Sequence, residues 1–149
     1  MTASTEAQTL TDENVRTMVT EWYRALDRHD PLDDVVNFLA SDGLTMTFPE
    51  GTFRGLGEFT TWYHNVTNRF FDEVHEVTEV QVASSAPDRA VVKVVVNWQA
   101  KVWDPPEATS KWLGFDAYQT WTVVLENDTV RILEYVVDDL AAMPGSATL

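Results

Sequence analysis

The sequence contains no cysteine among its 149 residues, which excludes disulfides, thiol nucleophiles and thiolate metal sites. It also lacks an apolar run long enough to span a bilayer. Positive charge is scarce, because 10 Lys and Arg stand against 24 Asp and Glu, for a formal net charge of −14. Nucleic acids and anionic membrane surfaces would be repelled by such a chain, so we expect neither as a partner.

Length and composition predict one soluble domain, since 149 residues with 44% hydrophobic and 23% charged side chains suffice for a core. We predict a disordered N-terminus over residues 1–10, one domain over residues 11–140 and a flexible tail over residues 141–149 that does not pack. The N-terminus has neither basic residues nor the apolar core of a signal peptide. We therefore expect a cytoplasmic protein.

In residues 90–103 two sets of side chains alternate with a period of two, which predicts a β-strand with two different faces. Its first face is wholly apolar and needs a cover of helices, whereas the second face is mixed. A strand of this length is expected to curve, and a curved sheet with helices in its concavity encloses a pocket. The apolar face consists of Ala90, Val92, Val94, Val96, Trp98, Ala100 and Val102.

The remaining elements follow from periodicity and capping. Thr11 is a helix cap, and apolar residues at intervals of three and four, Trp22 among them, predict a helix to about Arg28. A short second helix, a hairpin over residues 44–54 and a third helix from about Gly57 come next. Further strands are predicted over residues 75–84, 112–125 and 130–138. In the second of these the alternation leaves the face assignment open, and we expect the more apolar set, which contains Gln119, to face inward.

The phrases "FRGLGEFTTWYHNV", "HEVTEVQV" and "RILEYVVDD", together with the Trp98 strand, are similar to the nuclear transport factor 2-like superfamily, in particular its SnoaL-like branch. The resemblance covers residues 12–139. It implies an α+β fold shaped as a cone, with three N-terminal helices packed on the concave face of a curved antiparallel sheet and an apolar pocket at the wide end. The superfamily includes isomerases, dehydratases, polyketide cyclases, epoxide hydrolases and domains without known chemistry, so the resemblance alone does not fix an activity.

Each enzymatic subtype of the superfamily matches this sequence incompletely. The positions that carry the base and the oxyanion donor of ketosteroid isomerases hold Phe48 and Trp22 here. Scytalone dehydratases use a histidine at the start of the strand after the third helix, which His75 matches, but their second histidine falls at Asn97 or Trp98. The Asp-Arg-Asp arrangement of limonene-type epoxide hydrolases has no counterpart.

His75 is the strongest candidate for acid–base catalysis, because an imidazole titrates near neutral pH. A histidine at a strand end can equally be structural. Tyr63 is the second catalytic candidate, matching a supporting tyrosine of the family, although it could instead pack with its hydroxyl at the surface. His29 and His64 are expected to be solvated. No histidine has metal-ligand spacing with a carboxylate, so we predict neither a metal nor another cofactor.

Six tryptophans are many for this length, and those not needed for core filling would suit the walls of a pocket. We expect an apolar, cyclic small molecule as the ligand. Two functions stay open: a cofactor-free lyase, isomerase or cyclase in which His75 moves a proton, and a binding or dimerisation domain without chemistry. The expected ligand-binding residues, beside the two catalytic candidates, are Trp22, Phe48, Trp98, Gln119, Trp121 and Tyr135.

The mixed face of the sheet is too apolar for free solvent and too polar for a core. Val91, Val95 and Trp103 alternate there with polar residues, and Ile132 and Val136 are expected to extend the same surface. We predict a homodimer through this convex face, an arrangement that the family resemblance also implies.

Overall fold

The computed structural model describes residues 9–149. The predicted disordered N-terminus, residues 1–10, lies outside these residues except for its last two positions. Leu10 contradicts the prediction, because its side chain is buried and its N–H donates to the carbonyl of Pro87 at 2.9 Å. The ordered packing of the chain therefore already includes Leu10.

The elements occur in the predicted order. The helices are α1 (Asp12–Asp27), α2 (Leu32–Val35), the short 3₁₀ helix η2 (Val36–Phe38) and α3 (Gly55–Arg69). The strands are β1 (Thr45–Phe48), β2 (Gly51–Arg54), β3 (Phe71–Ala86), β4 (Arg89–Val102), β5 (Lys111–Glu126) and β6 (Thr129–Ala142). The third helix and the strand after it begin earlier than the sequence predicts.

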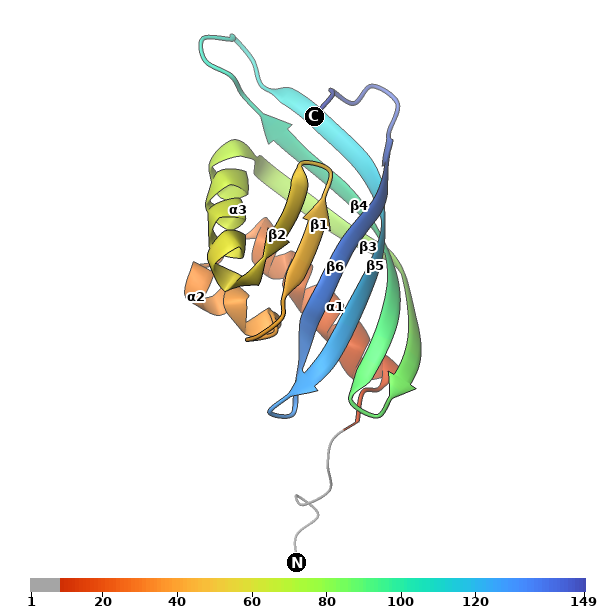
Figure 1. The fold of residues 1–149 in the computed structure, drawn as a ribbon. Helices are drawn as coiled ribbons and strands as arrows, with labels where there is room; N and C mark the ends of the chain where they lie inside the picture. Colours follow the sequence, from red (N-terminus) through yellow and green to blue (C-terminus); the bar gives the residue numbers. More distant parts are fainter. Residues whose placement is uncertain (1–8) are drawn as a thin grey trace, which may run out of the picture.

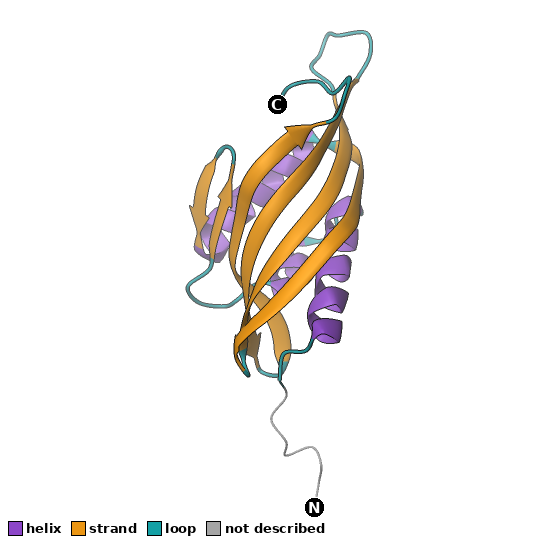
Figure 2. Cartoon of the chain, turned by 90° about the vertical axis from the view of Figure 1, so that its right-hand side faces the viewer, coloured by secondary structure: helices purple, strands orange, loops and turns teal. Residues whose placement is uncertain are grey.

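The strands form one sheet of six in the order β2-β1-β6-β5-β4-β3. The four long strands, β3 to β6, pair with one another in antiparallel fashion, but β1 pairs with β6 in parallel, so the expected antiparallel sheet is a mixed one. The sheet is strongly curved, and the helices lie on its concave side (Figures 1 and 2). The α+β cone fold predicted from the sequence is thus confirmed.

Helix α1 begins with a capping box, in which the Thr11 hydroxyl accepts from the Asn14 backbone N–H at 3.0 Å and the Asn14 side chain accepts from the Thr11 N–H at 2.8 Å. Its buried stripe packs against β3. The last turn of α1 thereby lies beside the start of β3. No helix within residues 9–149 has both the length and the apolarity to cross a membrane.

The predicted inward faces of β4 and β5 are largely buried, and Gln119 is the single buried polar side chain among the described residues, 3% exposed. The prediction for Ile132 is wrong, because this residue is fully buried instead of lying on the convex face. A β-bulge causes the difference: Thr122 pairs with Glu134 but Val123 pairs with Ile132, so Leu133 is an extra residue that exchanges the two faces of β6.

The predicted unpacked tail beyond residue 140 is also corrected. Strand β6 continues to Ala142, and the chain after it stays along β5: the Met143 N–H donates to the Gly114 carbonyl and the Ala147 N–H to the Trp112 carbonyl, both at 2.9 Å. Backbone pairing, which needs no apolar side chains, holds this small-residue segment. It brings the final residue, Leu149, to the wide end of the cone.

Candidate functional site

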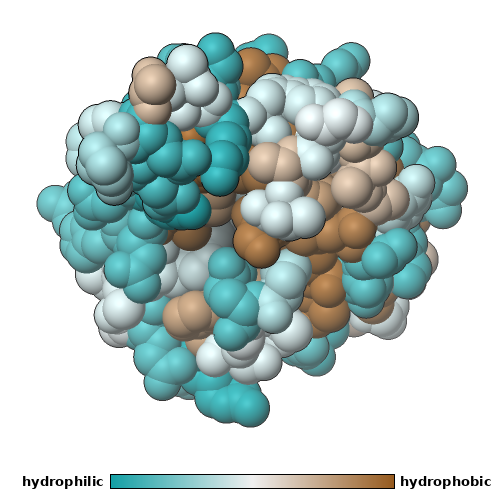
Figure 3. Space-filling model, turned by 90° about the horizontal axis from the view of Figure 1, so that it is seen from above, coloured by the Kyte–Doolittle hydropathy of each residue, from teal (hydrophilic) through white to brown (hydrophobic). Residues whose placement is uncertain are grey.

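A cavity of about 120 Å³ opens at the wide end of the cone, between α1, α3 and the concave face of the sheet. Figure 3 views this end and shows apolar side chains gathered inside a largely polar rim. The cavity volume is somewhat smaller than the about 150 Å³ of an apolar cavity that binds benzene, so the cavity has room for at most one small ring. Any larger ligand would extend out of the cavity; Glu50, Phe70 and Leu149 are also among the lining residues.

Most of the residues expected at the pocket do line it. Two do not: Trp22 and Trp121 are both fully buried and pack behind the cavity wall. The Trp22 ring lies 5.9 Å from that of Phe38 and 6.2 Å from that of Phe59, so this side of the wide apolar stripe of α1 faces the other helices. The predicted residues that line the cavity are Phe48, Tyr63, His75, Trp98, Gln119 and Tyr135.

His75 is held by Asp27, the last residue of α1. One carboxylate oxygen of Asp27 accepts from the backbone N–H of His75 at 2.9 Å, and the other bonds the ring Nδ1 at 2.5 Å. The His75 side chain is 10% exposed. Two contacts from one carboxylate fix both the strand and the ring, so the imidazole has a defined orientation in the cavity wall.

The pairing also fixes which ring nitrogen is free. An ionised carboxylate only accepts hydrogen bonds, so the hydrogen of a neutral His75 ring is on Nδ1 and Nε2 has an open lone pair. The ring lies between two aromatic neighbours, with centroids 4.7 Å from Tyr23 and 6.1 Å from Trp98. Because the His75 ring lines the apolar cavity, its Nε2 is the candidate proton acceptor of the site.

A second histidine–carboxylate pair lies beside the first. Nε2 of His29 is 2.6 Å from one oxygen of Glu73, and the indole N–H of Trp98 donates to the other oxygen at 3.1 Å. Glu73 lines the cavity with a side chain only 9% exposed, whereas His29 is 29% exposed. The expectation that His29 is simply solvated is therefore wrong, because the turn after α1 directs it toward β3.

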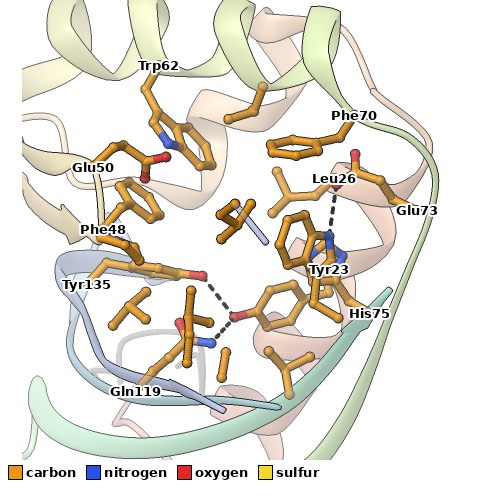
Figure 4. Close-up of a pocket in the computed structure, with 18 of the residues that line it drawn as sticks. Tyr23, Leu26, Phe48, Glu50, Trp62, Phe70, Glu73, His75, Gln119 and Tyr135 are labelled. Carbon is orange, nitrogen blue, oxygen red and sulfur yellow. Dashed lines mark hydrogen bonds between the residues drawn. The ribbon is translucent and has the colours of Figure 1, made fainter. Parts of the chain in front are cut away.

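The cavity floor carries a polar network, of which Figure 4 shows the contacts among Gln119, Tyr23 and Tyr135. The Trp121 indole N–H donates to Gln119 Oε1 at 3.0 Å, which orients the amide because an indole can only donate. Gln119 Nε2 then donates to the Tyr23 hydroxyl at 2.8 Å, and the hydroxyls of Tyr23 and Tyr135 are 2.9 Å apart. The hydrogen bond between the two hydroxyls uses only one of their two hydrogens. The other hydrogen remains for a ligand oxygen.

Burial keeps these hydroxyls protonated. It raises the pKa of Tyr23 well above its ordinary value and that of Tyr135 to about 12. Burial, with nearby Asp30 and Glu73, also raises the pKa of Tyr63 to about 12. The Tyr63 hydroxyl already donates to the Asp30 carbonyl at 2.5 Å, so this residue lines the cavity without a spare hydrogen for a ligand.

Sequence reasoning missed four polar residues of this site: Tyr23, Asp27, His29 and Glu73. Tyr23 and Asp27 are four residues apart on α1, a spacing that places both on one helix face and that could have identified them. Glu73 is two residues before His75 on β3, so strand alternation could have identified it once the true start of β3 was known, whereas His29 lies outside any helix or strand. Within residues 9–149 no group of three or more His, Asp or Glu side chains is arranged to hold a metal ion.

The fold is similar to that of solved proteins of low sequence identity. Hexachlorocyclohexane dehydrochlorinase LinA type 3 from Novosphingobium barchaimii is 12% identical, with 92% of each chain covered and a TM-score of 0.72. A proposed dehydratase of the NTF2-like family from Streptomyces avermitilis is 17% identical, with 89% of this chain and 95% of that chain covered and a TM-score of 0.71. A sequence comparison with curated proteins gives no significant match.

The curved sheet and the helices in its concavity place the chain in the class of NTF2-like folds. Within that class, the model of the SnoaL-like domain matches residues 19–135, which is most of the chain. The protein belongs to the SnoaL-like domain family.

Proposed function

We propose that the protein is a cofactor-free lyase or isomerase that removes a proton from the carbon next to a carbonyl group in a small cyclic molecule. The observation that carries the proposal is the His75–Asp27 pair in the wall of an apolar cavity. A largely buried imidazole that a carboxylate orients, with Nε2 free, has the geometry of a general base. The small ring follows from the size and apolar lining of the cavity.

The three polar parts of the site have separate roles in this reaction. His75 Nε2 takes the proton, and Asp27 stabilises the imidazolium that results without itself becoming protonated. The hydroxyl hydrogen left over in the Tyr23–Tyr135 pair is donated to the carbonyl oxygen as negative charge develops on it. In a site shielded from water such a donor is worth more than in solution, because the local dielectric constant is low.

The similar structures support this class of reaction. A dehydrochlorinase and a dehydratase both carry out eliminations, and an elimination begins or proceeds with loss of a proton from carbon. The competing function is binding without chemistry, which the stacked rings of Phe48 and Trp62, 4.2 Å apart in the apolar wall, would serve as well. Turnover separates the two.

The test uses cyclohexanone, a ring of suitable size, in D₂O. We expect the protein to accelerate exchange of the protons next to the carbonyl, followed by ¹H NMR. His75→Ala should lower the rate by about 10²- to 10⁴-fold, the usual contribution of a positioned acid–base group, and Asp27→Asn should also lower it. His64→Ala is the matched control, because His64 is exposed and lies outside the cavity.

Binding is measured in parallel through tryptophan fluorescence. Binding of cyclohexanone without exchange by the wild-type protein would favour the non-catalytic function. Equal rates for the wild-type protein and His75→Ala would remove His75 from the mechanism.

A further inference from the structure

We propose that Glu73 and His29 form a second proton-transfer pair, which protonates a leaving oxygen, and that the substrate is therefore a cyclic ketone with a hydroxyl group on the carbon beyond the one that His75 deprotonates. This inference rests on the proposed function, because it assigns the acid that complements the His75 base. It selects loss of water over other eliminations and isomerisations.

Hydrogen bonds fix the Glu73 carboxyl group in the cavity wall, and His29 links it to solvent, as a general acid requires. Its side chain is 9% exposed, it lines the cavity, and both its oxygens have partners, His29 at 2.6 Å and the Trp98 indole at 3.1 Å. Burying a carboxyl group is unfavourable unless it is paired, so the two contacts explain how it is tolerated there. His29 is 29% exposed and so connects the cavity carboxyl to solvent.

The backbone on both sides of this pair has an unusual conformation. His29 and Asp72 have φ values of 51° and 50°, in the left-handed region that costs side-chain-bearing residues energy. The other non-glycine residues with positive φ within residues 9–149, Asn127 and Asp128, belong to the turn between β5 and β6. Outside that turn, the strained positions are therefore the acid's partner and its immediate neighbour.

A β-bulge accompanies this strain. The pairing of β3 with β4 shifts between Phe71 and Val74, so that two residues of β3, Asp72 and Glu73, lie opposite one residue of β4. Bulges of this kind redirect side chains and are frequent next to active sites. The chain thus departs from regular structure at the residue that brings a carboxyl group into the cavity.

The two histidine–carboxylate pairs come from the same two parts of the chain, so the base and the acid lie on one wall of the cavity. The end of α1 supplies Asp27 and His29, and the start of β3 supplies Glu73 and His75. Glu73 and His75 are two residues apart on one strand and both line the cavity. A substrate against this wall would present a C–H bond to one group and the neighbouring C–O bond to the other on the same face of the ring, which predicts a syn elimination.

The step balances without any other reactant. His75 Nε2 accepts the proton from carbon, the C–H electrons form the C=C bond, and the C–O bond breaks with its electron pair on oxygen. The Glu73 carboxyl gives that oxygen a proton, so water leaves. Solvent then takes the proton from His75 and returns one to Glu73 through His29. No group is oxidised or reduced.

The test compares 3-hydroxycyclohexanone with 3-chlorocyclohexanone, because hydroxide needs a proton to leave and chloride does not. Both yield cyclohex-2-enone, followed by its ultraviolet absorbance. Glu73→Gln should lower the hydroxyl elimination by about 10²- to 10⁴-fold and leave the chloride elimination nearly unchanged. Glu79→Gln, an exposed glutamate of the same strand, is the matched control. Circular dichroism checks that each variant folds.

His29 acts through Glu73 and is tested as a positioning residue. Glycine adopts positive φ readily, so His29→Gly keeps the backbone conformation and leaves space where the ring was. We expect the hydroxyl elimination to fall in this variant and to recover when imidazole is added. A purely structural histidine would give no such recovery.

The outcomes separate this inference from the proposed function. Equal loss of both eliminations in Glu73→Gln would overturn the inference and leave His75 as the base. Exchange of cyclohexanone protons by the wild-type protein without any elimination from 3-hydroxycyclohexanone would do the same. Absence of exchange as well would overturn the proposed function together with the inference.

Discussion

Replacing Gln119 by leucine removes the amide that joins the two halves of the polar floor. The amide accepts from Trp121 Nε1 at 3.0 Å and donates to the Tyr23 hydroxyl at 2.8 Å. The two groups that lose it are affected differently. Tyr23 keeps its contact with Tyr135, whereas the fully buried Trp121 indole has no other hydrogen-bond partner within the described residues.

The cost can be estimated from these contacts. A buried donor left without a partner costs about 1–3 kcal/mol, and the lost bond to Tyr23 adds about 1 kcal/mol. We expect Gln119→Leu to lower the free energy of unfolding by about 2–4 kcal/mol. For a chain of this size each kcal/mol shifts Tm by about 2–4 °C, so Tm should fall by between about 4 and 16 °C.

The assay is thermal unfolding followed by near-ultraviolet circular dichroism, combined with a double-mutant cycle. Trp121→Phe removes the donor, so in that background Gln119→Leu should cost about 1–3 kcal/mol less than in the wild-type protein. Tyr135→Phe is the comparison variant, since it leaves the contacts of Gln119 in place. The same cost for Gln119→Leu in both backgrounds would refute the assigned network.

Three further predictions concern the tyrosines, one glycine and the convex face. Tyr135→Phe should leave the phenolate absorbance of the folded protein at about pH 11 unchanged, because burial raises the pKa of Tyr135 to about 12. A lower absorbance in Tyr135→Phe than in the wild-type protein would contradict the raised pKa. The free energy of unfolding should fall as the pH rises from about 10 toward 12, since Tyr135 releases its proton at lower pH in the unfolded chain than in the folded protein. Gly114→Ala should be destabilised by about 1–3 kcal/mol in urea unfolding, because an added Cβ would overlap the Trp112 ring, and wild-type stability would contradict that contact. We also propose that the protein dimerises through the convex face, where Val91 and Tyr118 are 38% and 45% exposed; Tyr118→Lys should then give a monomer by light scattering, and a monomeric wild-type protein at micromolar concentration would refute the dimer.

Regular parts of the fold were predictable because they follow a period. The alternation of β4 and β5 identified their buried faces, and Thr11 marked the start of α1. One extra residue, Leu133, was enough to place Ile132 on the wrong face, because a bulge leaves no signal in the alternation. The hydrophobic period therefore predicts which helices and strands form. Bulges decide where the buried side of a strand is exchanged for the exposed one.

The candidate site was predictable only in part, for a related reason. His75 and Gln119 were expected from their strand positions, and both line the cavity. Their partners come from other parts of the chain: Asp27 is 48 residues before His75 and Tyr23 is 96 residues before Gln119. Trp22 was placed at the cavity because it belongs to the wide apolar stripe of α1. The sequence does not show which residues of that stripe contact the sheet and which contact the other helices, because this depends on how the helices pack.

The most direct test of the central claim, that His75 is a base oriented by Asp27, is ¹⁵N NMR of the protein labelled at histidine, at a pH where the His75 ring is neutral. The signals of His75 are assigned by their loss in His75→Ala. The structure predicts a hydrogen on Nδ1, a free Nε2 whose shift changes when cyclohexanone is added, and loss of the preference for Nδ1 in Asp27→Ala. A hydrogen on Nε2, or a ring unaffected by the ketone, would contradict the claim.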